Sequence, residues 1–110
     1  MGDFAALLSE DVRLALLQFL SEGSYSQNES VLRDLLKRTG RLLPTDKLRT
    51  ELAWLREQGL VFIEDVYDTW VASISQRGLD VATGVAQVPG VKRPNPRRGD
   101  RSVAPTWLEQ

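Results

Sequence analysis

The chain has 110 residues, of which 42% are hydrophobic and 26% charged, and these proportions indicate one ordinary globular domain. It contains no cysteine and no histidine, which excludes disulfides, thiolate metal sites and histidine-based acid–base catalysis. The net charge of −1 hides an uneven distribution, because five of the basic residues lie within 92–101 and the body before them is acidic. Those five residues are Lys92, Arg93, Arg97, Arg98 and Arg101.

No targeting or membrane segment is visible, since the N-terminal residues lack a basic leader and the longest apolar runs are far shorter than the roughly 20 residues that span a bilayer. We therefore expect a cytoplasmic protein without membrane contact. The remaining metal ligands are scattered carboxylates, so no metal and no cofactor is expected. The chain offers no nucleophile–base pair and no glycine-rich phosphate loop, and we do not expect an enzyme.

The first predicted helix covers residues 4–22, with Ser9 as a candidate N-cap. One apolar stripe recurs at helical spacing along it, through Val12, Leu16, Phe19 and Leu20. A second side of the same helix is apolar as well, which makes it a candidate homodimer interface. That second side carries Leu7, Leu8, Leu14 and Leu17.

Two shorter helices follow. One begins after Asn28, a suitable N-cap, and ends at Gly40. The other covers residues 44–58 and ends before Gly59. Its inward stripe consists of Leu48, Leu52 and Leu55.

The period then changes, and residues 60–74 predict a β-hairpin with its turn at 65–68. A last short helix is expected at 75–83, with Ser75 as its cap. Proline and glycine break any regular element after Gly84. The sequence therefore predicts a folded domain at 1–87 and an extended, basic, proline-rich C-terminal tail at 88–110.

Three helices, a hairpin and a closing helix predict a mainly α fold with a β-hairpin, namely a winged helix-turn-helix. The third helix would be the recognition helix and the hairpin would be the wing. The alternative is a small helical domain with an incidental hairpin.

Particular stretches resemble known proteins. Residues 48–61, LRTELAWLREQGLV, resemble the recognition helix and first wing strand of many prokaryotic winged-helix regulators, and residues 75–82, SQRGLDVA, resemble their helix after the wing. Residues 28–30 and 84–94 resemble a family of small proteins of Mu-like transposable bacteriophages and prophages, some of which are labelled ArsR-like regulators. The resemblance implies a phage protein in a bacterial host cell. Without cysteine and histidine, a metal sensor of the ArsR type is rejected.

The third helix supplies the candidate nucleic-acid contacts of the body. Lys47, Arg49 and Arg56 lie on its flanks, where they could reach phosphates, and Thr50 points outward, where it could touch a base edge. Outward acidic residues oppose this hypothesis, as does the predicted wing, which carries only acidic charge. The alternative, which we prefer, is that Arg49 and Arg56 belong to a solvated surface with acidic neighbours.

The tryptophans and the tail leave further alternatives open. Trp54 is a candidate partner-interface anchor, or a partly buried residue that packs on the wing near Val61 or Trp70. The tail is an arm that follows DNA phosphates, a segment that docks on a partner through Trp107 and Leu108, or a solvated terminus.

Two functional hypotheses remain. The first is a DNA-binding or transcription-regulating module of a phage or prophage. The second is a protein-interaction or assembly adaptor that uses the same scaffold without sequence-specific DNA binding.

Overall fold

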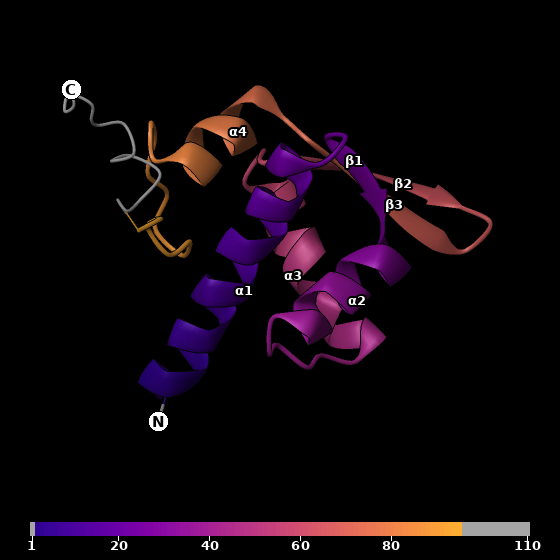
Figure 1. Ribbon diagram of the computed structural model, residues 1–110, viewed down its shortest axis with the longest axis horizontal. Coiled ribbons are helices and arrows are strands. Elements are labelled where there is room, and N and C mark those ends of the chain that lie inside the picture. The colour runs from indigo at the N-terminus through magenta and orange to yellow at the C-terminus, as the bar shows by residue number, and fades with distance from the viewer. Residues whose placement is uncertain (1, 96–110) are drawn as a thin grey trace, which may run out of the picture.

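The computed structural model describes residues 2–95. In chain order it contains the helix α1 (Gly2–Glu22), the strand β1 (Ser26–Asn28), the helices α2 (Glu29–Arg38) and α3 (Thr45–Glu57), the strands β2 (Val61–Val66) and β3 (Thr69–Ile74), and the helix α4 (Gln76–Thr83). The four predicted helices and the predicted hairpin are confirmed, but the turn predicted at 65–68 is too long, because Asp65 and Val66 still pair with β3. Figure 1 shows α1 running through the middle of the molecule, with the hairpin projecting away from it at one end.

Local sequence explains where most of these elements begin and end. The Asn28 side chain accepts a hydrogen bond of 2.9 Å from the backbone N–H of Val31, and the Ser75 hydroxyl accepts one of 3.0 Å from that of Gly78. Both predicted N-caps are therefore confirmed. The prediction for Ser9 is wrong, because α1 already begins at Gly2, and the Ser9 hydroxyl donates instead to the Glu51 carboxylate.

The sheet has one strand more than predicted. β1 pairs antiparallel with β3, Ser26 opposite Ser73, so the strand order is β1-β3-β2. The turn between β2 and β3 consists of Tyr67 and Asp68, which both have positive φ angles, 51° and 66°. Two left-handed residues in a two-residue loop match the right-handed twist of a hairpin. β2 is consequently an edge strand with β3 on one side.

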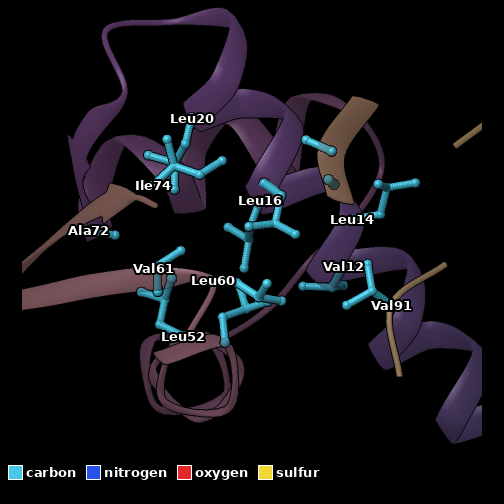
Figure 2. Close-up of a cluster of buried hydrophobic side chains, with 14 of the residues drawn as sticks. Val12, Leu14, Leu16, Leu20, Leu52, Leu60, Val61, Ala72, Ile74 and Val91 are labelled. Carbon is cyan, nitrogen blue, oxygen red and sulfur yellow. The ribbon is translucent and has the colours of Figure 1, made fainter. Parts of the chain in front are cut away.

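The core forms where α1 meets α3 and the base of the hairpin. Figure 2 shows Leu52 of α3 beside Val61 of β2, with Leu16 and Leu20 of α1 lying beyond Val61. All four of these side chains are almost fully buried. Two residues that the sequence assigned to a dimer face, Leu14 and Leu17, also belong to this core.

α4 closes the core by direct contact with the chain before the hairpin. A Cβ atom on Gly78 would collide with the carbonyl oxygen of Leu60, so glycine permits the approach of the helix. Glycine lowers the helix propensity of α4 at this position, but a larger residue would prevent the close packing of α4.

The folded body continues beyond residue 87, the predicted end of the domain. Val88 and Val91 are buried, and Figure 2 shows Val91 beside Val12 of α1. The backbone N–H of Lys92 donates to the carbonyl of Glu10 at 3.2 Å. The first residues of the predicted tail are therefore part of the folded body.

Candidate nucleic-acid interface

The buried carboxylate of Glu29 joins α2, α3 and the hairpin. Arg49 of α3 donates to it from Nε at 2.7 Å and from Nη2 at 2.6 Å, and the backbone N–H of Trp70 donates to it at 3.0 Å. The hydrogen bonds from Arg49 hold the pKa of Glu29 below its ordinary value of 4.5, although burial alone would raise it, and the N–H of Trp70 lowers it further. This ion pair sets the position of the hairpin relative to α3.

The guanidinium of Arg49 is consequently occupied by contacts within the protein. Besides the Glu29 carboxylate, its guanidinium donates to the carbonyl of Asp68 at 2.7 Å and lies 4.9 Å from the ring centre of Trp70. The pKa of Arg49 is raised, first of all by the hydrogen bonds to Glu29. A guanidinium held at this many points has little freedom to turn toward a phosphate. Sequence reasoning placed Arg49 among acidic neighbours without identifying Glu29.

A second buried carboxylate, that of Glu51, joins α3 to α1. The Ser9 hydroxyl donates to it at 2.9 Å, and Arg13 donates from Nε at 2.7 Å. The Arg13 guanidinium also lies over Trp54, 3.9 Å from the ring centre, and donates to the carbonyl of Gly90 at 3.0 Å.

Trp54 is therefore partly buried, as expected, and packs on Arg13 and on the C-terminal segment. A Cβ atom on Gly90 would lie 2.6 Å from Cζ2 of Trp54. Since the ring contacts the backbone at Gly90 so closely, Trp54 fixes the path of the chain after α4.

The third ion-pair cluster lies on the other side of α1. Arg41 donates to the Asp11 carboxylate at 2.7 and 3.1 Å, and Nζ of Lys92 lies 3.4 Å from it. The hydrogen bond from Arg41 lowers the pKa of Asp11, against the effect of burial, and the charges of Arg41 and Lys92 lower it further. Lys92, a candidate phosphate contact, thus also has an acidic partner in the body.

Three other candidates remain exposed on α3. Lys47 and Arg56 lie near opposite edges of the solvent-facing side of the helix, and Thr50 lies between them. Within residues 2–95, neither Lys47 nor Arg56 lies within 4.0 Å of a carboxylate, although Arg56 lies 5.7 Å from the Trp70 ring centre. The Thr50 hydroxyl donates to the carbonyl of Asp46 at 3.0 Å. Asp46 and Glu57 share this side and are exposed too.

The hairpin presents a different surface. Glu64, Asp65 and Asp68 are exposed on it, together with the apolar or aromatic side chains of Phe62 and Tyr67, which are 65% and 98% exposed. Negative charge on the predicted wing opposes an approach to phosphates.

Several candidates lie outside the described residues, namely Arg97, Arg98, Arg101, Trp107 and Leu108. Arg93 is described and exposed. Within the part of the chain that the structure describes, no cluster of three or more potential metal-ligating side chains occurs. None of the helices described is long and apolar enough to cross a membrane.

Two relatives match most of the chain, whereas no protein-family model matches it. Uncharacterized protein gp26 of Escherichia phage Mu is 43% identical over 91 residues, which are 83% of this chain and 95% of the phage protein. An uncharacterized protein of Haemophilus influenzae is 46% identical over 81 residues, which are 73% of this chain and 79% of that protein.

A solved structure is similar in fold. A chain in the complex structure of hsRosR-S4 superposes with a TM-score of 0.55 at 19% identity, over 64% of this chain and 62% of that one. At this identity, and over less than two thirds of the neighbour, the likeness concerns the fold alone. The resemblance to Mu-like phage proteins is confirmed by the two sequence relatives, neither of which carries a regulator label. The chain belongs to the family that contains gp26 of phage Mu and the Haemophilus influenzae protein.

Proposed function

We propose that the protein is a winged-helix module that binds DNA weakly and without sequence preference, with α3 as the DNA-facing helix and β2–β3 as the wing. Most phosphate contacts come from the basic residues that follow Lys92, which itself pairs with Asp11; they are Arg93, Arg97, Arg98 and Arg101. The order of elements, with a hairpin directly after α3 and a strand between α1 and α2, supports the winged-helix assignment.

One observation carries this proposal, the capture of Arg49 by Glu29. It leaves Lys47 and Arg56 as the exposed cations of α3, with the acidic Asp46 and Glu57 between them. Two flanking cations can touch the phosphates on either side of a groove, but the acidic residues weaken any contact with base edges. Phosphate neutralisation must therefore come largely from elsewhere in the chain, and the largest cluster of basic residues is at 92–101.

Fluorescence anisotropy with a labelled random duplex, at two salt concentrations, tests the proposal in the full chain. The triple variant Arg97→Ala/Arg98→Ala/Arg101→Ala should lose most of the affinity, whereas Lys47→Ala/Arg56→Ala should lose a smaller part. Arg38→Ala is the matched control, since Arg38 is exposed on α2 and pairs with Asp34. The logarithm of affinity should fall with the logarithm of salt by about 0.9 per phosphate contact.

Two results would overturn the proposal. A tight complex with one duplex that resists random competitor, and that Thr50→Ala or Arg56→Ala destroys, would mean that α3 reads bases and that a transcription-regulating role is the better assignment. No binding of any duplex at low salt would mean that the partner is a protein.

The second candidate function is a protein-interaction or assembly adaptor. The exposed apolar and acidic surface of the hairpin favours it, because aromatic side chains at solvent-exposed positions are typical of protein interfaces. If the adaptor function is correct, Phe62→Ser/Tyr67→Ser should abolish capture of a partner and leave DNA binding unchanged.

A further inference from the structure

The N-terminal turns of α1 extend past the rest of the body and carry uncovered apolar side chains. Figure 1 shows this end of α1 projecting beyond the other helices. Phe4, Leu7 and Leu8 are 67%, 61% and 52% exposed, although they are large and apolar. Three such residues on adjacent turns form an exposed apolar patch, and such patches are typical of interaction sites.

A hollow lies beside this patch. It has a volume of about 390 Å³, lies between α1 and the segment that joins α2 to α3, and is lined in part by Leu8, Val12, Leu42 and Leu43. Leu42 is 75% exposed at its rim. We call this hollow, together with Phe4 and Leu7, the α1 groove. Its apolar lining would accept an aromatic or aliphatic side chain.

The chain leaves the described part of the structure next to this groove. Lys92 is fixed to α1 through Glu10 and Asp11, and Lys92, Arg93 and Asn95 line a neighbouring hollow together with Asp11 and Arg41. Asp11 and Arg41 also line the α1 groove. Asn95, the last described residue, therefore lies in a hollow that shares Asp11 and Arg41 with the α1 groove and continues along α1 toward Gln18. The twelve residues from 96 to 107 can span up to about 40 Å, which is ample to reach any part of the α1 groove.

The charge and composition of the C-terminal tail are complementary to those of the N-terminal part of α1. The first twelve residues of the chain contain Asp3, Glu10 and Asp11 and no basic residue. Because Asp11 already pairs with Arg41 and Lys92, the charge complementarity rests on Asp3 and Glu10. The tail first supplies Arg97, Arg98 and Arg101 and then Trp107 and Leu108. A basic stretch followed by an apolar pair is complementary to an acidic helix that borders an apolar hollow.

We propose that Trp107 and Leu108 dock into the α1 groove of their own chain, with the arginines at 97–101 passing along the acidic side of α1. A second copy of the chain is a poorer occupant of the same surface. Two copies paired through this end of α1 would bring their acidic residues close together, and like charges in an interface are unfavourable. This inference does not depend on the proposed DNA contact. Trp107 and Leu108 would then act as anchors, as the sequence suggests, but their binding site would lie on the same chain.

Nuclear magnetic resonance on the full chain tests the proposal without DNA. In a mixture of isotope-labelled and unlabelled protein, the indole protons of Trp107 should give intramolecular Overhauser effects to the methyl groups of Leu8 and Leu42. The amide protons of Trp107 and Leu108 should exchange with solvent at least about tenfold more slowly than in an unstructured peptide.

Leu42→Asp should abolish both signals, because it places a charge at the rim of the groove. Phe62→Asp is the matched control, since Phe62 is 65% exposed on the hairpin, and it should preserve both. Unchanged amide shifts for the core leucines would establish that each variant is folded. Unstructured exchange rates in the original chain would overturn the proposal. Overhauser effects that are intermolecular alone would overturn it in favour of a second copy.

Discussion

Arg49 of α3 donates two hydrogen bonds, of 2.7 and 2.6 Å, to the carboxylate of Glu29, the first residue of α2. The same carboxylate accepts the backbone N–H of Trp70 in β3. One buried acid therefore satisfies groups from two other elements, and the angle of the hairpin to α3 depends on it.

Replacing this acid should destabilise the protein. Glu29→Gln keeps the size of the side chain but removes the charge that Arg49 requires, and we expect the free energy of unfolding to fall by about 1.5–3 kcal/mol. Urea unfolding followed by circular dichroism measures the change. Asp34→Asn is the control, because Asp34 and Arg38 form an exposed pair on α2 whose loss should cost less than about 0.5 kcal/mol. Equal losses in the two variants would contradict a structural role for Glu29.

Stability should fall in acid. The pKa values of Glu29 and Asp11 are lower in the folded chain than their ordinary values of 4.5 and 3.8, so the unfolded chain binds protons more readily than the folded one does. Their contribution is therefore complete well above pH 4.5 and is lost as the pH falls through the lowered folded values. Without histidine, stability should change little between pH 8 and pH 6. Urea midpoints from pH 8 to pH 2 measure this dependence, and Glu29→Gln/Asp11→Asn should flatten its acid limb.

Gly90 is the position in the C-terminal segment where an added methyl group should do most harm. Its φ is +100°, and a Cβ atom would lie 2.6 Å from Trp54. Gly40→Ala is the matched control, with a φ of +86° and no atom within 4 Å of the added carbon. The control should lose about 1 kcal/mol from backbone strain, and Gly90→Ala should lose about 1–3 kcal/mol more because the ring must move. Thermal unfolding measures the loss of stability, and tryptophan fluorescence compared in a Trp54→Phe background reports the movement of the ring. Similar losses would mean that the ring is not tightly held.

The inward stripe of α3 can be tested at its centre. Leu52 is fully buried, and Leu52→Ala should destabilise the chain by about 2–5 kcal/mol through the cavity that it leaves. Val85→Ala is the surface control, since Val85 is 78% exposed. A loss below about 1 kcal/mol for Leu52→Ala in urea unfolding would contradict the packing of α3 against α1.

The sequence predicts the helices and the hairpin well because each follows from a local pattern. The apolar stripe of α3, the caps Asn28 and Ser75 and the change of period after Gly59 all act over a few residues. β1 has no such pattern, since its three polar residues SQN are held in the sheet by backbone pairing with β3. No periodicity could have indicated it.

The candidate site is harder to predict because its chemistry depends on pairs that are distant in sequence. Arg49 is correctly placed on α3, but its partner Glu29 lies 20 residues away in the chain, at the start of another helix. In the sequence Gly90 is one of several chain breakers, and its role follows only from the fold, which places Trp54 against it. Whether a charged side chain is paired within the fold or available to bind a partner can be decided only once its three-dimensional neighbours are known.

Val91 packs beside Val12, so the same core draws on residues near both ends of the described chain. During synthesis the helices and the hairpin are made first, but the surface of α1 that Val91 covers stays open until this residue emerges. Contacts across such a separation form late in folding and slow it. A ribosome-bound fragment that ends at residue 87 should therefore hold its secondary structure yet expose an apolar strip on α1, and it should aggregate more readily than the completed chain.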